Sequence, residues 1–179
     1  MSDRDIVRLA VDKAFVNLGV TEVGGENRGA AVEAYLASCI PPLPAGSPWC
    51  VAHVRFRLKQ AATELGLTYD KSMPRTGYTP DYVSWAVQKG LWVPKEKVAS
   101  GEVKPRKGDL CCFWFPVLNR HAHIGFVHNM SGTDRFLSIE GNTSAPTKVG
   151  VEREGDGLYL KTRKLSSLGR KGGFILLDF

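Results

Sequence analysis

Cys50 is the residue of this chain whose type and position best suit nucleophilic chemistry. It follows Ser47, Pro48 and Trp49, and it precedes a segment whose apolar residues recur every three or four positions. Serine is favoured at the N-cap and proline at the first helical position, so we predict that a helix begins here, with Cys50 in its first turn. The helix dipole and the free N–H groups of that turn favour a thiolate, which is the nucleophilic form of cysteine. A buried structural cysteine is the alternative interpretation.

A cysteine nucleophile needs a base, and the chain offers four histidines, His53, His121, His123 and His128. His123 opens a run typical of a strand, and a strand packed on the Cys50 helix would bring its ring to the sulfur. Gly125 would share the face of His123 and leave room for the substrate or for the helix. His121 is the alternative base if the strand begins early. His53 and His128 are expected to be structural.

The base in turn needs a polar partner that fixes its tautomer. The next predicted strand ends in Ser138-Ile139-Glu140-Gly141-Asn142-Thr143. Glu140 and Asn142 lie two residues apart, so both could face His123 across a hairpin, and either could orient it. An ordinary strand end followed by a Gly-Asn turn is the alternative interpretation.

The elements that must position these residues change character along the chain. The first half has helical periodicity, which predicts helices over residues 3–18, 30–39, 50–65 and 79–89. The second half has short runs rich in β-branched and aromatic residues, which predict strands at 109–115, 123–129, 135–140, 149–153, 158–161 and 173–177. Helices first and strands later predict an α+β fold with an antiparallel sheet, in a single domain over residues 1–179.

Composition narrows the classes of function. The net charge is +6, which favours anionic partners, yet no nucleic-acid motif has the required spacing. The mild basic clusters at 104–107 and 161–171 are interpreted as a solvated face. The four cysteines are unevenly spaced, which argues against a disulfide framework, and adjacent Cys111 and Cys112 are expected to be buried as small apolar residues.

Two further expectations concern location. No run approaches 18 apolar residues, so we expect no stable membrane insertion. The N-terminus lacks a basic segment followed by an apolar core, so we expect synthesis in the cytoplasm without a signal peptide.

Four short motifs occur in an order that resembles a known family. They are Pro48-Trp49-Cys50-Val51-Ala52, Lys107-Gly108-Asp109-Leu110, His123-Ile124-Gly125-Phe126-Val127 and Ile139-Glu140-Gly141-Asn142-Thr143. Together they resemble the CHAP family, the cysteine- and histidine-dependent amidohydrolases/peptidases of the NlpC/P60-like superfamily. The segment 18–36 also resembles a phage-associated branch of it.

The resemblance implies a papain-like fold with the nucleophile at a helix start. Cys50 matches the nucleophile, His123 the base, and Glu140 and Asn142 the polar positions that support it. Most members cleave peptidoglycan, as N-acetylmuramoyl-L-alanine amidases or as peptide endopeptidases, and many are phage lysins. Ala122 stands where relatives usually carry glycine. There is no acidic loop with calcium-ligand spacing, so neither a metal nor another cofactor is expected.

These observations together predict a monomeric peptidoglycan hydrolase, a phage lysin that reaches the wall by export or holin-type release. Trp49 is expected to shield the sulfur and, with Gly125, to contact the substrate. The alternatives are a secreted antibacterial amidase effector, a non-enzymatic wall-binding or phage structural protein, and another Cys–His chemistry such as acyl transfer or deamidation. A zinc module built on Cys50 and His53 is a further alternative.

Overall fold

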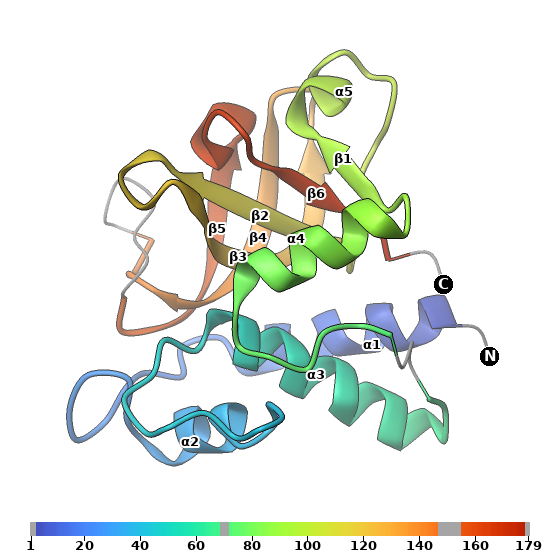
Figure 1. Ribbon diagram of the computed structural model, residues 1–179. Helices are drawn as coiled ribbons and strands as arrows, with labels where there is room; N and C mark the ends of the chain where they lie inside the picture. Colours follow the sequence, from blue (N-terminus) through green and yellow to red (C-terminus); the bar gives the residue numbers. More distant parts are fainter. Residues whose placement is uncertain (1–2, 69–71, 147–154, 178–179) are drawn as a thin grey trace.

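The computed structural model describes residues 3–68, 72–146 and 155–177, and it has the expected α+β architecture (Figure 1). Within these residues the chain forms five α-helices, α1 (Asp3–Val16), α2 (Ala30–Leu36), α3 (Cys50–Leu65), α4 (Thr79–Gln88) and α5 (Lys95–Ala99). Six strands follow the helices or lie between them, β1 (Trp92–Pro94), β2 (Leu110–Phe115), β3 (Arg120–Ser131), β4 (Arg135–Thr143), β5 (Gly157–Lys164) and β6 (Gly173–Ile175). Two short 3-10 helices span Pro116–Leu118 and Leu165–Leu168.

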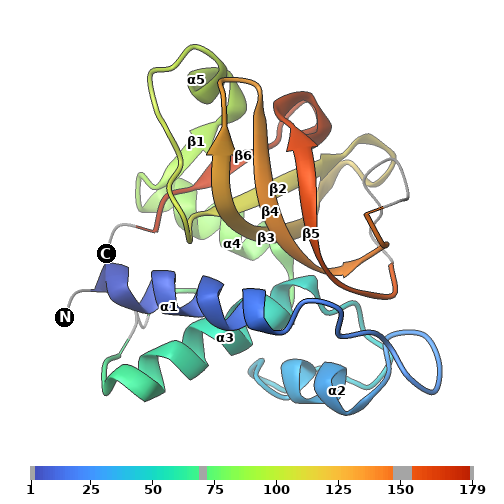
Figure 2. The same cartoon turned by 180° about the vertical axis from the view of Figure 1, so that it is seen from behind.

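The strands form one antiparallel sheet in the order β1-β6-β2-β3-β4-β5. Helices α1 and α3 lie side by side below the sheet, and α2 lies against α3 on the side away from it (Figures 1 and 2). Helix α4 packs against β3. The N-terminal helices therefore cover the middle strands, where His123 and Glu140 are found.

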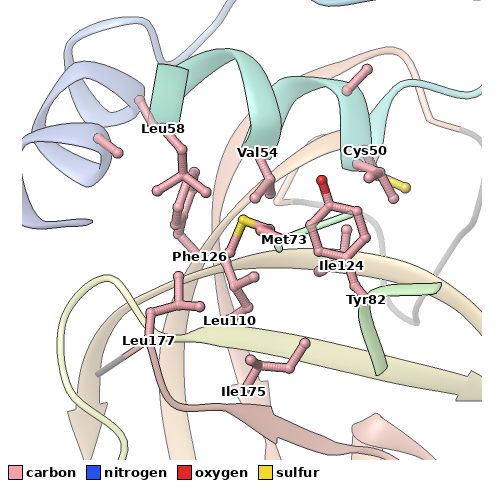
Figure 3. Packing of buried hydrophobic residues seen from close by; sticks show 14 of the residues in the cluster. Cys50, Val54, Leu58, Met73, Tyr82, Leu110, Ile124, Phe126, Ile175 and Leu177 are labelled. Carbon is pink, nitrogen blue, oxygen red and sulfur yellow. The ribbon is translucent and has the colours of Figure 1, made fainter. Parts of the chain in front are cut away.

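Helix α3 carries the candidate nucleophile, and its sequence explains its position. Val54, Leu58 and Ala61 recur at three and four residues and are fully buried. Val54 and Leu58 face the sheet (Figure 3). Burying each large side chain stabilises the fold by about 1.5–3 kcal/mol. Gly66 ends the helix in the left-handed conformation, with φ of 64°, as the pattern predicted.

The helix begins later than its capping residues suggested. Its N-cap is Trp49, which has φ of −120° and makes no side-chain capping hydrogen bond, and Cys50 is the first helical residue. Ser47 and Pro48 precede the helix and line a cavity instead. The prediction that Ser47 caps the helix is therefore wrong, although Cys50 still lies in the first turn.

Strand alternation separates the two adjacent cysteines. Cys112 faces the helices with Ile124 and Phe126, whereas Cys111 faces a second apolar cluster that includes Phe113. Both thiols are fully buried and free, as expected for small apolar residues. Because burial raises the pKa of each thiol, neither has the character of a nucleophile.

Asp109 joins three distant parts of the chain. Its buried carboxylate accepts hydrogen bonds from the Arg4 side chain at 2.7 Å, the Arg106 backbone at 2.6 Å and the Leu177 backbone at 3.1 Å. Gly108 before it has φ of 97°, and a Cβ there would meet Val7 of α1. The Lys-Gly-Asp-Leu motif therefore has a structural role, which is to hold α1 and the C-terminal segment against β2.

The other differences between the predicted and the observed helices and strands are small. Helix α2 ends at Leu36 rather than at Cys39, and the short elements β1 and α5 were not predicted. The predicted strand at 149–153 lies outside the described residues. Among the described residues, no helix has the length and apolar character needed to cross a membrane.

Candidate active site

Cys50 and His123 lie together where the N-terminus of α3 meets β3. The Cys50 side chain is almost buried, at 4% exposed, and it points from the first turn of α3 toward β3 near Ile124 (Figure 3). Its thiol interacts with the imidazole of His123, and the backbone N–H groups of Ile124 and Val51 donate toward the sulfur. The sulfur is thus surrounded by groups that stabilise negative charge.

The two groups change each other's protonation. Burial by itself raises the pKa of the Cys50 thiol, but the hydrogen bond and charge of His123 outweigh it and leave that pKa below its ordinary value. Burial by itself lowers the pKa of His123, but the hydrogen bonds and negative charges of Cys50 and Glu140 raise it to about 9. Both shifts favour a thiolate beside an imidazolium.

Glu140 fixes the orientation of the imidazole. The Nε2 atom of His123 bonds to Oε2 of Glu140 at 2.9 Å, and both side chains are fully buried. The Nδ1 atom has no conventional hydrogen-bond partner in the described part of the chain, so the interaction with Cys50 falls to that nitrogen. This arrangement holds the proton on Nε2 and leaves Nδ1 to exchange a proton with the sulfur.

Arg163 holds Glu140 in turn. Its Nε and Nη2 atoms donate to Oε1 and Oε2 of Glu140 at 2.9 and 2.7 Å, a bidentate pair, and Ser138 Oγ donates to Oε1. The guanidinium also lies 5.4 Å from the ring centre of Phe113. Burial by itself raises the pKa of Glu140, but Arg163 and His123 bring it well below its ordinary range. Glu140 is therefore an anion at all pH values where His123 can act.

The role of Arg163 was not predicted from the sequence. The basic residues from 161 onward were expected on a solvated face, but Lys161 and Arg163 are each only 5% exposed. Both point inward from β5, where Lys161 donates to the backbone carbonyl of Ser144 at 2.8 Å. Lys161 and Arg163 are two residues apart, so the sequence could have indicated that both cations lie on one face of this strand.

Asn142 does not share the position of Glu140. The pairing of β4 with β5 shifts between Glu140 and Thr143, and Asn142 takes a left-handed conformation with φ of 57°. This irregularity breaks the simple alternation that placed both side chains on one face. The amide of Asn142 is buried and bonds to neither His123 nor any other described residue. Of the two residues left open by the sequence, Glu140 is the one that orients His123.

Trp49 and Gly125 do not have the substrate contacts expected of them. Trp49 is fully buried, its indole N–H donates to Glu22 at 2.9 Å, and its ring lies against Gly141. Trp49 therefore anchors the start of α3 on β4. A Cβ at Gly125 would meet Cγ of Glu140 at 2.7 Å. The space beside Gly125 is occupied by the Glu140 side chain on its way to His123, so it admits neither the substrate nor the helix.

The other histidines are structural, as expected for two of them. His53 is fully buried among Tyr35, Trp49 and Phe126, and burial with the nearby Arg57 charge lowers its pKa well below its ordinary value. The ring of His128 stacks on Phe15. The alternative base, His121, bonds through Nε2 to the backbone carbonyl of Lys171 at 2.8 Å. A bulge between residues 113 and 114 of β2 places it apart from His123.

A cavity of about 410 Å³ opens at Cys50. Its walls come from the segment before α3, the segment leading into α4 and the start of β3, and Figure 1 shows α3 and α4 beginning on the same side of the molecule. Ala122 also lines it, next to His123. A substrate carbonyl placed in this cavity would reach the sulfur from outside, while the imidazole and its carboxylate partner stay in the interior.

In the described part of the chain, no three His, Cys, Asp or Glu side chains gather as metal ligands would. The sequence matches no protein-family model, and it shows no significant similarity to a curated protein.

Proposed function

We propose that this chain is a papain-like cysteine hydrolase that cleaves an amide bond of bacterial peptidoglycan. The proposed reaction rests on three neighbouring buried side chains, those of Cys50, His123 and Glu140. A cavity that could hold part of a peptide opens at Cys50. Helix α3 and the hairpin of β3 and β4, which lie far apart in the sequence, bring these side chains together. A structural cysteine in the core would need neither an imidazole beside it nor a cavity.

The geometry supports a two-step mechanism. The Cys50 thiolate attacks the scissile carbonyl carbon, and the carbonyl electrons move to oxygen, where the free N–H of Cys50 at the helix start stabilises the oxyanion. The imidazolium of His123 gives the Nδ1 proton to the leaving amine as the C–N bond breaks. Water then attacks the thioester, His123 takes its proton, and the carboxylic acid leaves as the Cys50 thiolate reforms. Glu140 stays ionised throughout and stabilises the imidazolium.

The identity of the substrate rests on the sequence. The order of the four motifs resembles enzymes that act on peptidoglycan, and the net charge of +6 favours binding to an anionic wall. A phage lysin is the proposed biological setting. A secreted antibacterial effector would use the same chemistry, so the site supports the reaction class more strongly than the setting.

The decisive experiment measures degradation of purified peptidoglycan by the wild-type chain, Cys50→Ala and Cys112→Ala. We expect Cys50→Ala to lose activity and to keep its fold, since Cys50 is at the cavity surface. Cys112→Ala is the matched control, because it removes a thiol from the core and leaves the site intact. Mass spectrometry of the released fragments identifies the cleaved bond. Full activity of Cys50→Ala would contradict the mechanism, and release of no fragment by the wild type would contradict the proposed substrate.

A further inference from the structure

The cavity at Cys50 has walls of different chemistry. Ile40, Pro41 and Leu43 give the lining an apolar part. The lining also includes two charged residues, Arg120 at the start of β3 and Asp81 in the first turn of α4. A cavity that served only to admit a neutral peptide would not require either charge.

Arg120 is held in place without an acidic partner. Its guanidinium lies 5.1 Å from the ring centre of Tyr78, and one Nη atom donates to the backbone carbonyl of His121 at 3.2 Å. It forms no ion pair with a carboxylate in residues 3–68, 72–146 or 155–177. The remaining N–H groups have the fork geometry that binds a carboxylate through two hydrogen bonds.

Asp81 is held in a similar way. Its Oδ2 atom accepts a hydrogen bond from Thr76 Oγ1 at 2.6 Å. It also makes no ion pair within the described residues, and Arg120 and Asp81 do not pair with each other although they line one cavity. Opposite charges that line one cavity without pairing match a ligand that carries both charges.

We propose that this cavity selects a peptide with a free carboxylate bound by Arg120 and a free amino group bound by Asp81, close to the scissile amide at Cys50. Arg120 lies three residues before His123 on β3, so the Cα atoms of these two residues are about 10 Å apart. That distance is about three residues of extended peptide. The inference rests on the proposed function, because it identifies the charged part of the same peptide substrate.

The test uses soluble muropeptides in matched pairs, one with a free stem-peptide carboxylate and one with that group converted to a carboxamide. We expect the wild type to favour the free carboxylate by about 10- to 100-fold in kcat/KM, mainly through KM, as charged hydrogen bonds do. Arg120→Met should lose this preference, so that the two peptides of the pair are cleaved with equal kcat/KM. Arg8→Met, which removes an exposed arginine of α1, is the matched control and should keep the preference.

A second pair of muropeptides tests Asp81, one with a free amino group and one with that group acetylated. The wild type should favour the free amine, and Asp81→Asn should not. Calorimetric binding of all four muropeptides to Cys50→Ala gives a readout without catalysis. Equal binding and equal cleavage within each pair would overturn the inference while leaving the hydrolase intact. A wild type that binds the charged peptides selectively but cleaves none would support the inference and contradict the proposed function.

Discussion

Replacing Glu140 by glutamine tests the buried part of the site. The substitution keeps the size of the side chain and removes the negative charge that faces His123 Nε2 at 2.9 Å. The amide oxygen of glutamine can still accept that hydrogen bond. Glu140→Gln therefore separates the electrostatic contribution of the carboxylate from its contribution to orientation.

The structure sets the size of the expected effect. The pKa of His123 is raised from 6.5 to about 9 by Cys50 and Glu140 together. At about 1.4 kcal/mol per unit, this corresponds to about 3 kcal/mol of stabilisation of the imidazolium, shared between the two anions. Loss of the stabilisation that Glu140 contributes should lower the apparent pKa of the Cys50–His123 pair by about one to two units. Maximal activity should fall by about 100-fold, because the imidazolium that acts as general acid loses the stabilising charge of Glu140.

The assay is the pH dependence of peptidoglycan degradation. Activity requires the imidazolium, so it is lost as pH rises through the pKa of His123, and the alkaline limb of the wild type should lie near pH 9. In Glu140→Gln this limb should move toward neutral pH. Glu102→Gln, which alters an exposed glutamate paired with Lys97, is the control and should leave the profile unchanged. An alkaline limb at the same pH in Glu140→Gln and wild type would refute this account of the site.

The same substitution has a predictable effect on stability. Glu140→Gln leaves the Arg163 guanidinium buried without its anion, which should lower the free energy of unfolding by about 3–5 kcal/mol. The wild-type imidazolium also stabilises the fold. Because its folded pKa is raised, that contribution is complete below pH 6.5 and is lost as pH rises toward 9. Urea unfolding at pH 6 and at pH 9 should therefore show a smaller pH dependence in Glu140→Gln than in the wild type.

Three other predictions follow from the packing and protonation of the site. Iodoacetamide at neutral pH should modify Cys50 first, because the pKa of its thiol is lowered and it lines the cavity. Cys112, whose thiol pKa is raised by burial, should react only when the protein unfolds. Peptide mass mapping of the native protein measures which cysteine is modified. Gly125→Ala should destabilise the fold by about 1–3 kcal/mol and reduce activity, because the new Cβ meets Glu140, and unfolding in urea with the degradation assay checks both effects. Asp109→Asn should lower the melting temperature without shifting the pH profile of activity, because Asp109 joins α1 to the sheet and does not contact Cys50, His123 or Glu140. Calorimetry measures the melting temperature, and the degradation assay measures the pH profile.

Local sequence was sufficient to predict the main helices and strands and to single out Cys50 and His123. Helical spacing from Val51 to Leu65 and the strand-like run from His123 identified the secondary structure, because periodicity records which face of an element is buried. The position of Cys50 in a first helical turn followed from the residues around it. The α+β order followed from the change of period along the chain, since helices and strands repeat differently.

Tertiary structure alone decided how the site is completed. A shift in the pairing of β4 and β5 selected Glu140 over Asn142, and inward packing of β5 turned Arg163 from an expected surface charge into the partner of that carboxylate. The meeting of β3 with the segments before α3 and α4 placed Arg120 and Asp81 beside Cys50. None of these contacts is local. A strand pattern shows that one face is buried, but the partner that meets that face depends on register and packing between segments far apart in the chain.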